Sequence, residues 1–164
     1  MPNELTNIVV AGLGGQGILS ATDIVAEAAL RAGHEVKKSE IKGMSQRGGS
    51  VTSDVRFGRQ VLSPMVPAGE ADYLLVLAAD QVPAYRHLLR LGGTLLTPEA
   101  VDPNQLANRK ALNVALLGCL SAHLNIAAEH WLAALRANFP ESFFDANRQA
   151  FELGRQSQQK TATT

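Results

Sequence analysis

The feature that most constrains the fold is a segment near the amino terminus where an apolar run, a glycine-rich turn and a helix start follow one another. The apolar run Ile8–Ala11 leads into glycines with the G-x-G-x-x-G spacing of dinucleotide-binding turns. In such turns the glycines permit a tight bend, close approach of a pyrophosphate and packing of the helix on the strand. The amide groups at the helix start also attract anions. The candidate cofactor-binding residues are therefore Gly12, Gly14, Gly15, Gln16 and Gly17.

The rest of the chain alternates between strand and helix patterns. Helical periodicity over 18–32 ends at Gly33, a position suited to a left-handed helix cap, and 34–39 has the pattern of a strand. Residues 50–57 alternate as a strand, and Gly58-Arg59 has the composition of a hairpin turn into 60–62. Further segments are predicted as follows: strands at 73–78 and 94–97, and helices at 81–90, 111–124, 129–138 and 140–154.

These patterns predict an α/β fold: a Rossmann-like three-layer sandwich with a mostly parallel sheet, a β-hairpin and a helical carboxyl-terminal part. We expect residues 1–154 to form a single domain. Residues 155–164, rich in Gln and Thr, are predicted to form a disordered tail.

Composition excludes several classes of protein. Fifteen basic and fifteen acidic residues cancel, which argues against a nucleic-acid-binding surface. No apolar run approaches the roughly 20 residues that span a bilayer, and the first residues lack a secretory pattern. We therefore expect a cytoplasmic protein with neither nucleic-acid nor membrane partners. Cys119 is the one cysteine, so this chain alone cannot supply the roughly four thiolates that hold an iron–sulfur cluster.

A second candidate site is the polar, glycine-broken loop at 42–49. Its donors are placed next to backbone that is free to adopt positive φ, an arrangement that can hold a carboxylate or phosphate. The alternative is a turn whose glycines only solve a packing problem, and the residues alone do not separate the two. The loop consists of Lys42, Gly43, Met44, Ser45, Gln46, Arg47, Gly48 and Gly49.

Other polar residues give weaker signals. Glu40 lies about 20 positions past the glycines, where nicotinamide enzymes place an acidic residue on the ribose, although Lys37 and Lys38 favour a phosphate, as in NADP or coenzyme A. A solvated strand end explains the same residues equally well. Asp80 follows the central strand and is expected to cap a helix. The four histidines lack metal-ligand spacing, and no catalytic constellation emerges.

Two motifs together resemble a known family. Val10–Gly17 followed by Glu40–Val51 is similar to the gamma-type domain of 2-oxoacid:ferredoxin oxidoreductases, with the nearest likeness in small subunits of the indolepyruvate type. Ser63-Pro64, Gly69–Asp72 and Asn113–Gly118 agree with it. The segment 98–110 looks short against the family, and Ala78–Gln81 lacks an expected Glu-Pro.

The resemblance implies an accessory subunit that is inactive alone. A larger partner subunit would carry thiamine diphosphate, magnesium and iron–sulfur clusters, and the complex would oxidise a 2-oxoacid such as indolepyruvate to an acyl-coenzyme A and pass electrons to ferredoxin. The two glycine motifs would then shape the subunit interface near coenzyme A and the 2-oxoacid. An isolated chain is expected to be able to form a homodimer through its orphaned interface. The alternative function is a stand-alone module that binds NADP or another dinucleotide.

Overall fold

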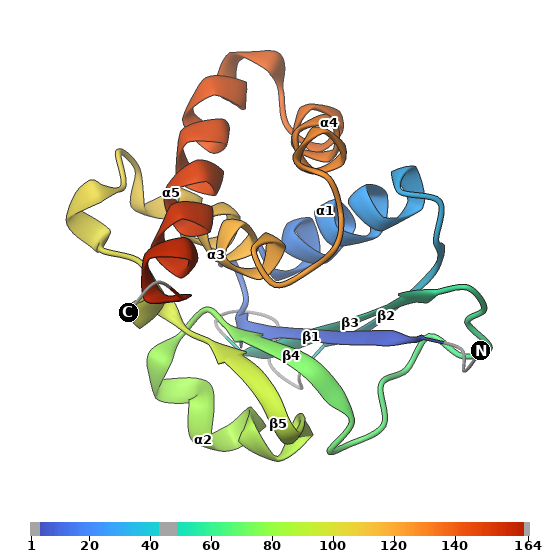
Figure 1. Cartoon of the computed structure of the whole chain (residues 1–164). Helices are drawn as coiled ribbons and strands as arrows, with labels where there is room; N and C mark the ends of the chain where they lie inside the picture. Colours follow the sequence, from blue (N-terminus) through green and yellow to red (C-terminus); the bar gives the residue numbers. More distant parts are fainter. Residues whose placement is uncertain (1–3, 43–48, 163–164) are drawn as a thin grey trace.

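A computed structural model describes residues 4–42 and 49–162, which form a mixed five-stranded sheet with helices on both faces (Figure 1). The strand order is β2-β3-β1-β4-β5. The strands are β1 Thr6–Leu13, β2 Glu35–Lys42, β3 Ser50–Gly58, β4 Ala71–Val76 and β5 Leu89–Leu96. The helices are α1 Ile18–Arg31, α2 Val82–Tyr85, α3 Leu112–Ser121, α4 Ala128–Asn138 and α5 Phe144–Ala162. Short 3₁₀ turns are η1 Ala79–Gln81, η2 Arg86–Leu88, η3 Pro98–Ala100, η4 Pro103–Gln105, η5 Arg109–Ala111 and η6 Glu141–Phe143.

The predicted α/β fold class is confirmed, with a sheet of mixed direction. β1 pairs with β4, and β4 with β5, in parallel. β3 runs antiparallel to both of its neighbours, β1 and β2. Four of the five strands therefore point the same way, and β3 is the exception inserted between β1 and β2. The hairpin is formed by β2 and β3, so the prediction of a hairpin from 50–57 into 60–62 was wrong.

Gly58 explains that error. It lies within β3, and a Cβ there would overlap the backbone carbonyl of Glu4, so the glycine permits close approach of the amino-terminal segment. Gly58 therefore serves packing, and the Gly58-Arg59 pair does not form a two-residue turn.

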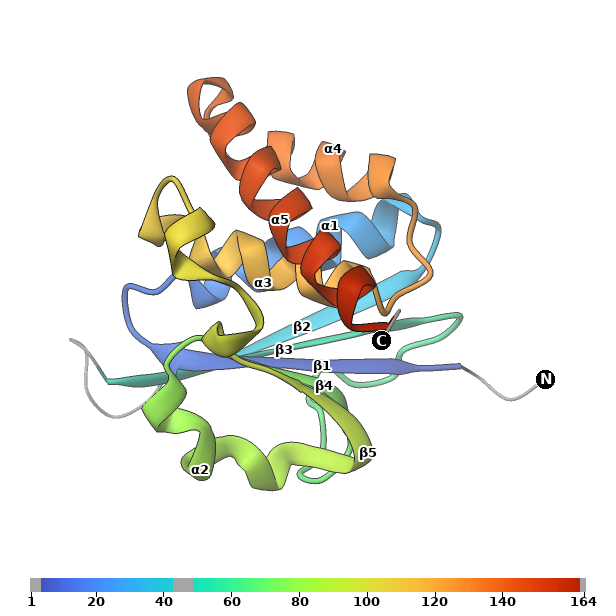
Figure 2. The same ribbon diagram turned by 60° about the vertical axis from the view of Figure 1, so that its left-hand side comes forward.

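β1 lies at the centre of the sheet and separates two apolar layers. Ile8 and Val10 face the main core beneath α1 and α3, and α4 and α5 pack beyond these helices. Val9 faces the opposite side, where Leu74 and Val76 meet α2 and its flanking turns in a smaller core. Figures 1 and 2 show this asymmetry, with α2 alone labelled on one face. The three-layer arrangement is thus present, with one thick and one thin helical layer.

The carboxyl-terminal helix is longer than predicted. α5 runs to Ala162, so the expected disordered tail from Arg155 is helical through that residue. The last part of α5 is held by contacts with α3 and the residues that follow it. Cys119 Sγ lies 3.5 Å from Ser157 Oγ, and His123 Nε2 lies 2.9 Å from Gln158 Oε1. Across the described ranges, no helix is long and apolar enough to cross a bilayer.

Candidate functional site

The predicted motifs meet at one edge of the sheet. β1 and β4 are parallel and end there, β2 ends there, and β3 starts there because it runs the other way. Open α/β sheets bind ligands beyond the carboxyl ends of their parallel strands. The glycine turn at 12–17, Gly49 and the η1 turn all belong to this edge.

The side chain of Gln16 braces the glycine turn. Its Oε1 accepts a hydrogen bond from the Leu13 amide at 2.8 Å, and its Nε2 donates to the Leu77 carbonyl oxygen at 3.3 Å. A Cβ at Gly12 would stand 2.6 Å from Gln16 Oε1, so glycine is needed there to admit this side chain. The amide of Gln16 therefore joins the end of β1 to the segment that follows β4.

Gly17 forms the start of α1 in the left-handed region, with φ of +79°. No side chain caps the helix, so its first amide groups are available. Asn113 at the start of α3 donates from Nδ2 to the Gly17 carbonyl oxygen at 3.2 Å. A Cβ at Gly17 would overlap that Asn113 amide. The turn is thus fixed on its other side by α3.

The two predicted motifs are in direct contact. The Gly14 amide donates to the Gly49 carbonyl oxygen at 2.9 Å. Next to it, Ser50 Oγ donates to Gln81 Oε1 at 3.2 Å. Lys42 ends β2 at this edge, and Gly43, Met44, Ser45, Gln46, Arg47 and Gly48 lie outside the described residues. The prediction that the second motif binds a ligand or partner stays a prediction.

The predicted ribose contact does not form part of this site. β3 lies between β1 and β2, so Glu40 is about 5 Å farther from β1 than in a sheet where β2 neighbours β1, at about 4.8 Å per strand. Glu40 Oε1 lies 3.8 Å from Lys38 Nζ, and Lys38 also pairs with Asp23. These charges neutralise one another on an edge strand. The interpretation as a solvated strand end fits them best.

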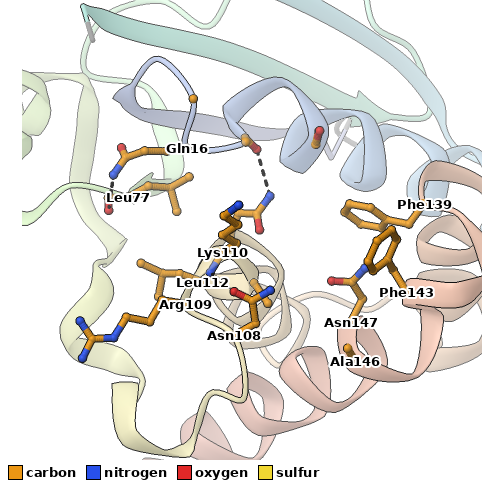
Figure 3. A pocket seen from close by; sticks show the side chains of 15 residues that line it. Gln16, Leu77, Asn108, Arg109, Lys110, Leu112, Phe139, Phe143, Ala146 and Asn147 are labelled. Carbon is orange, nitrogen blue, oxygen red and sulfur yellow. Dashed lines mark hydrogen bonds between the residues drawn. The ribbon is translucent and has the colours of Figure 1, made fainter.

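A cavity of about 670 Å³ opens beside the glycine turn (Figure 3). Its walls come from the turn, the segment before α3, and the α4–α5 connection with the start of α5. The lining residues include Gly15, Gln16, Gly17, Ser20, Leu77, Asn108, Arg109, Lys110, Asn113, Phe139, Phe143 and Asn147. Gly15, Gln16 and Gly17 were predicted as binding residues from the sequence, and the other lining residues were not. The signal that could have indicated them is Arg109-Lys110, two consecutive cations directly before an apolar helix.

Other candidate residues behave as structural groups. Asp80 lies inside the η1 turn and is exposed, so the expectation that it caps a helix was wrong; Ala78 holds the capping position. Cys119 is buried, and burial raises the pKa of its thiol, as expected of an inert core cysteine. Among the described residues, no group of three or more His, Cys, Asp or Glu side chains could hold a metal ion.

A mixed α/β sheet with a braced glycine turn at its carboxyl edge defines a Rossmann-like domain in which β3 is added between the first two strands. Residues 7–157 match the family model described as pyruvate ferredoxin/flavodoxin oxidoreductase, and the chain belongs to this family. It is a subunit of a 2-oxoacid:ferredoxin oxidoreductase, with a gamma-type domain.

Individual relatives agree with this assignment. Indolepyruvate oxidoreductase subunit IorB of Thermococcus kodakarensis is 35% identical over 188 aligned residues, which cover 90% of this chain and 93% of the relative. The crystal structure of a keto/oxoacid ferredoxin oxidoreductase gamma subunit from Geobacter sulfurreducens superposes with a TM-score of 0.80 at 25% identity, covering 96% of this chain and 98% of that one.

A third match shows the same fold within a longer polypeptide. The 2-oxoglutarate:ferredoxin oxidoreductase of Magnetococcus marinus, solved with 2-oxoglutarate, coenzyme A and succinyl-CoA bound, superposes with a TM-score of 0.83 at 21% identity. The match covers 96% of this chain and 31% of that one. The region that matches this chain is thus one part of a longer polypeptide there.

Proposed function

We propose that this chain is the accessory subunit of an aryl-pyruvate ferredoxin oxidoreductase, with indolepyruvate as the representative substrate. The complex would convert one 2-oxoacid, one coenzyme A and two oxidised ferredoxins into acyl-coenzyme A, carbon dioxide, one proton and two reduced ferredoxins. A larger partner subunit would carry thiamine diphosphate with magnesium, which stabilises the carbanion left by decarboxylation, and the iron–sulfur clusters that take the electrons.

The observation that carries this proposal is the likeness to an IorB subunit over nearly the full length of both chains. Cysteine content supports the division of labour. With Cys119 as its one cysteine, this chain cannot supply the thiolates of a cluster by itself. We therefore assign the iron–sulfur clusters to another chain and expect the isolated subunit to be inactive.

The role proposed for this chain is to close the site of the partner subunit. The glycine turn presents Gly14 and Gly15 as exposed backbone, and Gly14 is tied to Gly49. Exposed backbone held in a fixed shape is suited to close contact with a second chain or with coenzyme A. We propose that residues 12–17 and 42–49 form this interface near the 2-oxoacid and coenzyme A, with Arg47 binding a carboxylate or phosphate.

The test is reconstitution of the complex. The chain is co-expressed with a thiamine-binding large subunit from the same organism, purified anaerobically, and assayed for coenzyme A-dependent ferredoxin reduction with indolepyruvate, phenylpyruvate, pyruvate and 2-oxoglutarate. We expect aryl pyruvates to give the highest kcat/KM and the separate subunits to give no turnover. Preference for pyruvate or 2-oxoglutarate would contradict the substrate assignment, and failure of the two chains to copurify would contradict the subunit assignment.

Arg47 offers a second test in the same complex. Arg47→Ala is expected to lower acyl transfer or assembly at least tenfold, because a charge-assisted contact is lost. Arg59→Ala is the matched control, since Arg59 is an exposed arginine at the opposite end of β3. Full turnover by an assembled Arg47→Ala complex would remove the role proposed for Arg47.

A further inference from the structure

The cavity beside the glycine turn has a cationic side. Arg109 and Lys110 lie on η5 and line the cavity, and both side chains are exposed. Within the part of the chain that the structure describes, neither has an ion-pair partner. The uncapped first turn of α1 opens onto the same cavity through Gly17 and Ser20. This side of the cavity is therefore positively charged, and no carboxylate among its described lining residues neutralises that charge.

The opposite end of the cavity is aromatic. Phe139, at the end of α4, and Phe143, just before α5, both line it, and Phe143 is 57% exposed. Figure 3 shows these rings with Asn147 at one end of the cavity, Lys110 near the glycine turn, and Arg109 on the far side. The exposed ring of Phe143 offers a face on which a planar group of a ligand can pack. The side-chain amide of Asn147 has no hydrogen-bond partner among the described residues and adds a polar group at this end.

Three further polar side chains in the wall are already engaged. Asn108 Oδ1 accepts a hydrogen bond from the Lys110 amide at 3.0 Å, which fixes the η5 turn. Asn113 is held by the Gly17 carbonyl oxygen, and Gln16 braces the turn. These parts of the wall are therefore pre-organised, and the groups left for a ligand are the two cations, the open helix start with Ser20, the two rings and Asn147.

We infer that this cavity binds a ligand in which a planar aromatic group is joined to an anionic group. The rings of Phe139 and Phe143 would pack on the planar group, and Lys110, Arg109 and the start of α1 would neutralise the anion. The volume of about 670 Å³ lies in the range of small-molecule sites. Two sources share this chemistry: an aryl 2-oxoacid, with a carboxylate, and an adenine nucleotide, with phosphates.

This inference goes beyond the proposed function because it assigns a binding site to this chain by itself. The site is built wholly from described residues of one chain, so it is expected to bind without the partner subunit. Its failure is therefore distinguishable from failure of the proposed function, which is measured by turnover of the complex.

The test is isothermal titration calorimetry on the full-length chain with four probes: phenylpyruvate, indole-3-pyruvate, adenosine 3′,5′-bisphosphate and inorganic phosphate. We expect binding of one aromatic class at least tenfold tighter than binding of phosphate. Preference for the aryl pyruvates identifies the carboxylate source, and preference for the bisphosphate identifies the nucleotide source. Affinity should also fall as NaCl is raised from 50 to 500 mM, because the cations are exposed.

Matched variants locate the site. The double variant Arg109→Gln/Lys110→Gln is expected to lower affinity at least tenfold, and Phe143→Ala about fivefold. Arg59→Gln and Leu30→Ala are the controls, an exposed cation and an exposed apolar residue that lie away from the cavity. Absence of binding to every probe at millimolar concentration would overturn the inference, as would equal affinity of the cavity variants and the controls. Circular dichroism of each variant verifies that it is folded.

Discussion

Gly17 and Gly33 show how the surroundings of a residue set the cost of changing it. They lie at the two ends of α1, with φ of +79° and +94°. A Cβ at Gly17 would overlap the amide of Asn113, whereas a Cβ at Gly33 would meet open space. Gly33→Ala is therefore expected to cost about 1 kcal/mol from backbone strain alone, and Gly17→Ala about 2–3 kcal/mol, because Asn113 must also move.

Urea denaturation of both variants measures this difference. The Gly17→Ala variant should also lose affinity in the calorimetric experiment, since the turn forms part of the cavity wall. Equal unfolding free energies for the two variants would contradict this, because they would mean that displacing the Asn113 side chain does not destabilise the fold.

Asp54 is a second residue whose environment predicts a measurable effect. It is 5% exposed within β3, and burial raises the pKa of its carboxyl group, although its bond from the Val66 amide (2.9 Å) opposes the shift. The folded state thus binds a proton more tightly than the unfolded state. The contribution of Asp54 to stability therefore falls as pH rises from about 3.8 through the folded-state pKa, and is constant above it.

Asp54→Asn tests this because an asparagine oxygen can still accept from Val66 and cannot ionise. The difference in unfolding free energy between the wild type and Asp54→Asn should favour the wild type most at low pH and shrink as pH rises. Unfolding in urea from pH 3.5 to 7 measures it. A difference that does not vary with pH would contradict the raised pKa.

At the scale of elements, the crossing of α3 and α5 depends on two glycines in backbone contact. A Cβ at Gly118 would overlap the Phe151 carbonyl oxygen, and a Cβ at Gly154 would overlap the Ala115 carbonyl oxygen. Alanine is favoured over glycine by about 1 kcal/mol in a helix, yet either Gly→Ala change is expected to destabilise by more than about 3 kcal/mol, because the helices must separate. Gln149→Ala, on the exposed side of α5, is the control and should stay within about 0.5 kcal/mol of the wild type. Thermal unfolding followed by circular dichroism decides between these outcomes.

Local patterns predicted most elements and failed where distant contacts decide. β1, α1 with its Gly33 end, β3 and α4 follow periodicities visible in the sequence. The helix predicted over 81–90 is broken into η1, α2 and η2, and Gly92-Gly93 lies inside β5, where Gly92 has φ of +75° at an irregular pairing with β4. The last turns of α5 have polar composition and are held by contacts such as His123 with Gln158, which composition does not reveal.

The candidate site likewise has one part that the sequence predicts and one part that it does not. The glycine turn was predictable because its spacing is local. The cavity was not, because Lys110 and Phe143 are separated by 32 intervening residues and meet only through the packing of α3 and α5. An irregular segment such as 98–110 has no periodicity from which its position can be inferred.

For the whole molecule, the strand order argues against the alternative function. Dinucleotide-binding domains place the second strand beside the first, so that its terminal acidic residue reaches the ribose. Here β3 takes that place, and Glu40 is paired with Lys38. We therefore expect NAD and NADP to bind the isolated chain no more tightly than adenosine 3′,5′-bisphosphate, because the second ribose and the nicotinamide gain no contact of their own. Calorimetry against both dinucleotides and the bisphosphate, with a known NADP-dependent reductase as positive control, tests this; binding of either dinucleotide about tenfold tighter than the bisphosphate, about 1.4 kcal/mol, would restore the dinucleotide-binding alternative.

The position of β1 at the centre of the sheet also has a consequence for biosynthesis. β1 leaves the ribosome first, yet both of its neighbours, β3 and β4, are encoded later, the nearer beginning at Ser50. At 5–20 residues per second, the apolar strand waits roughly two to seven seconds for β3. During that interval its unpaired edges are open to other nascent chains. Slow translation of residues 43–49 would lengthen this exposure, so the yield of the folded subunit should depend on chaperone supply as well as on the stability of the finished fold.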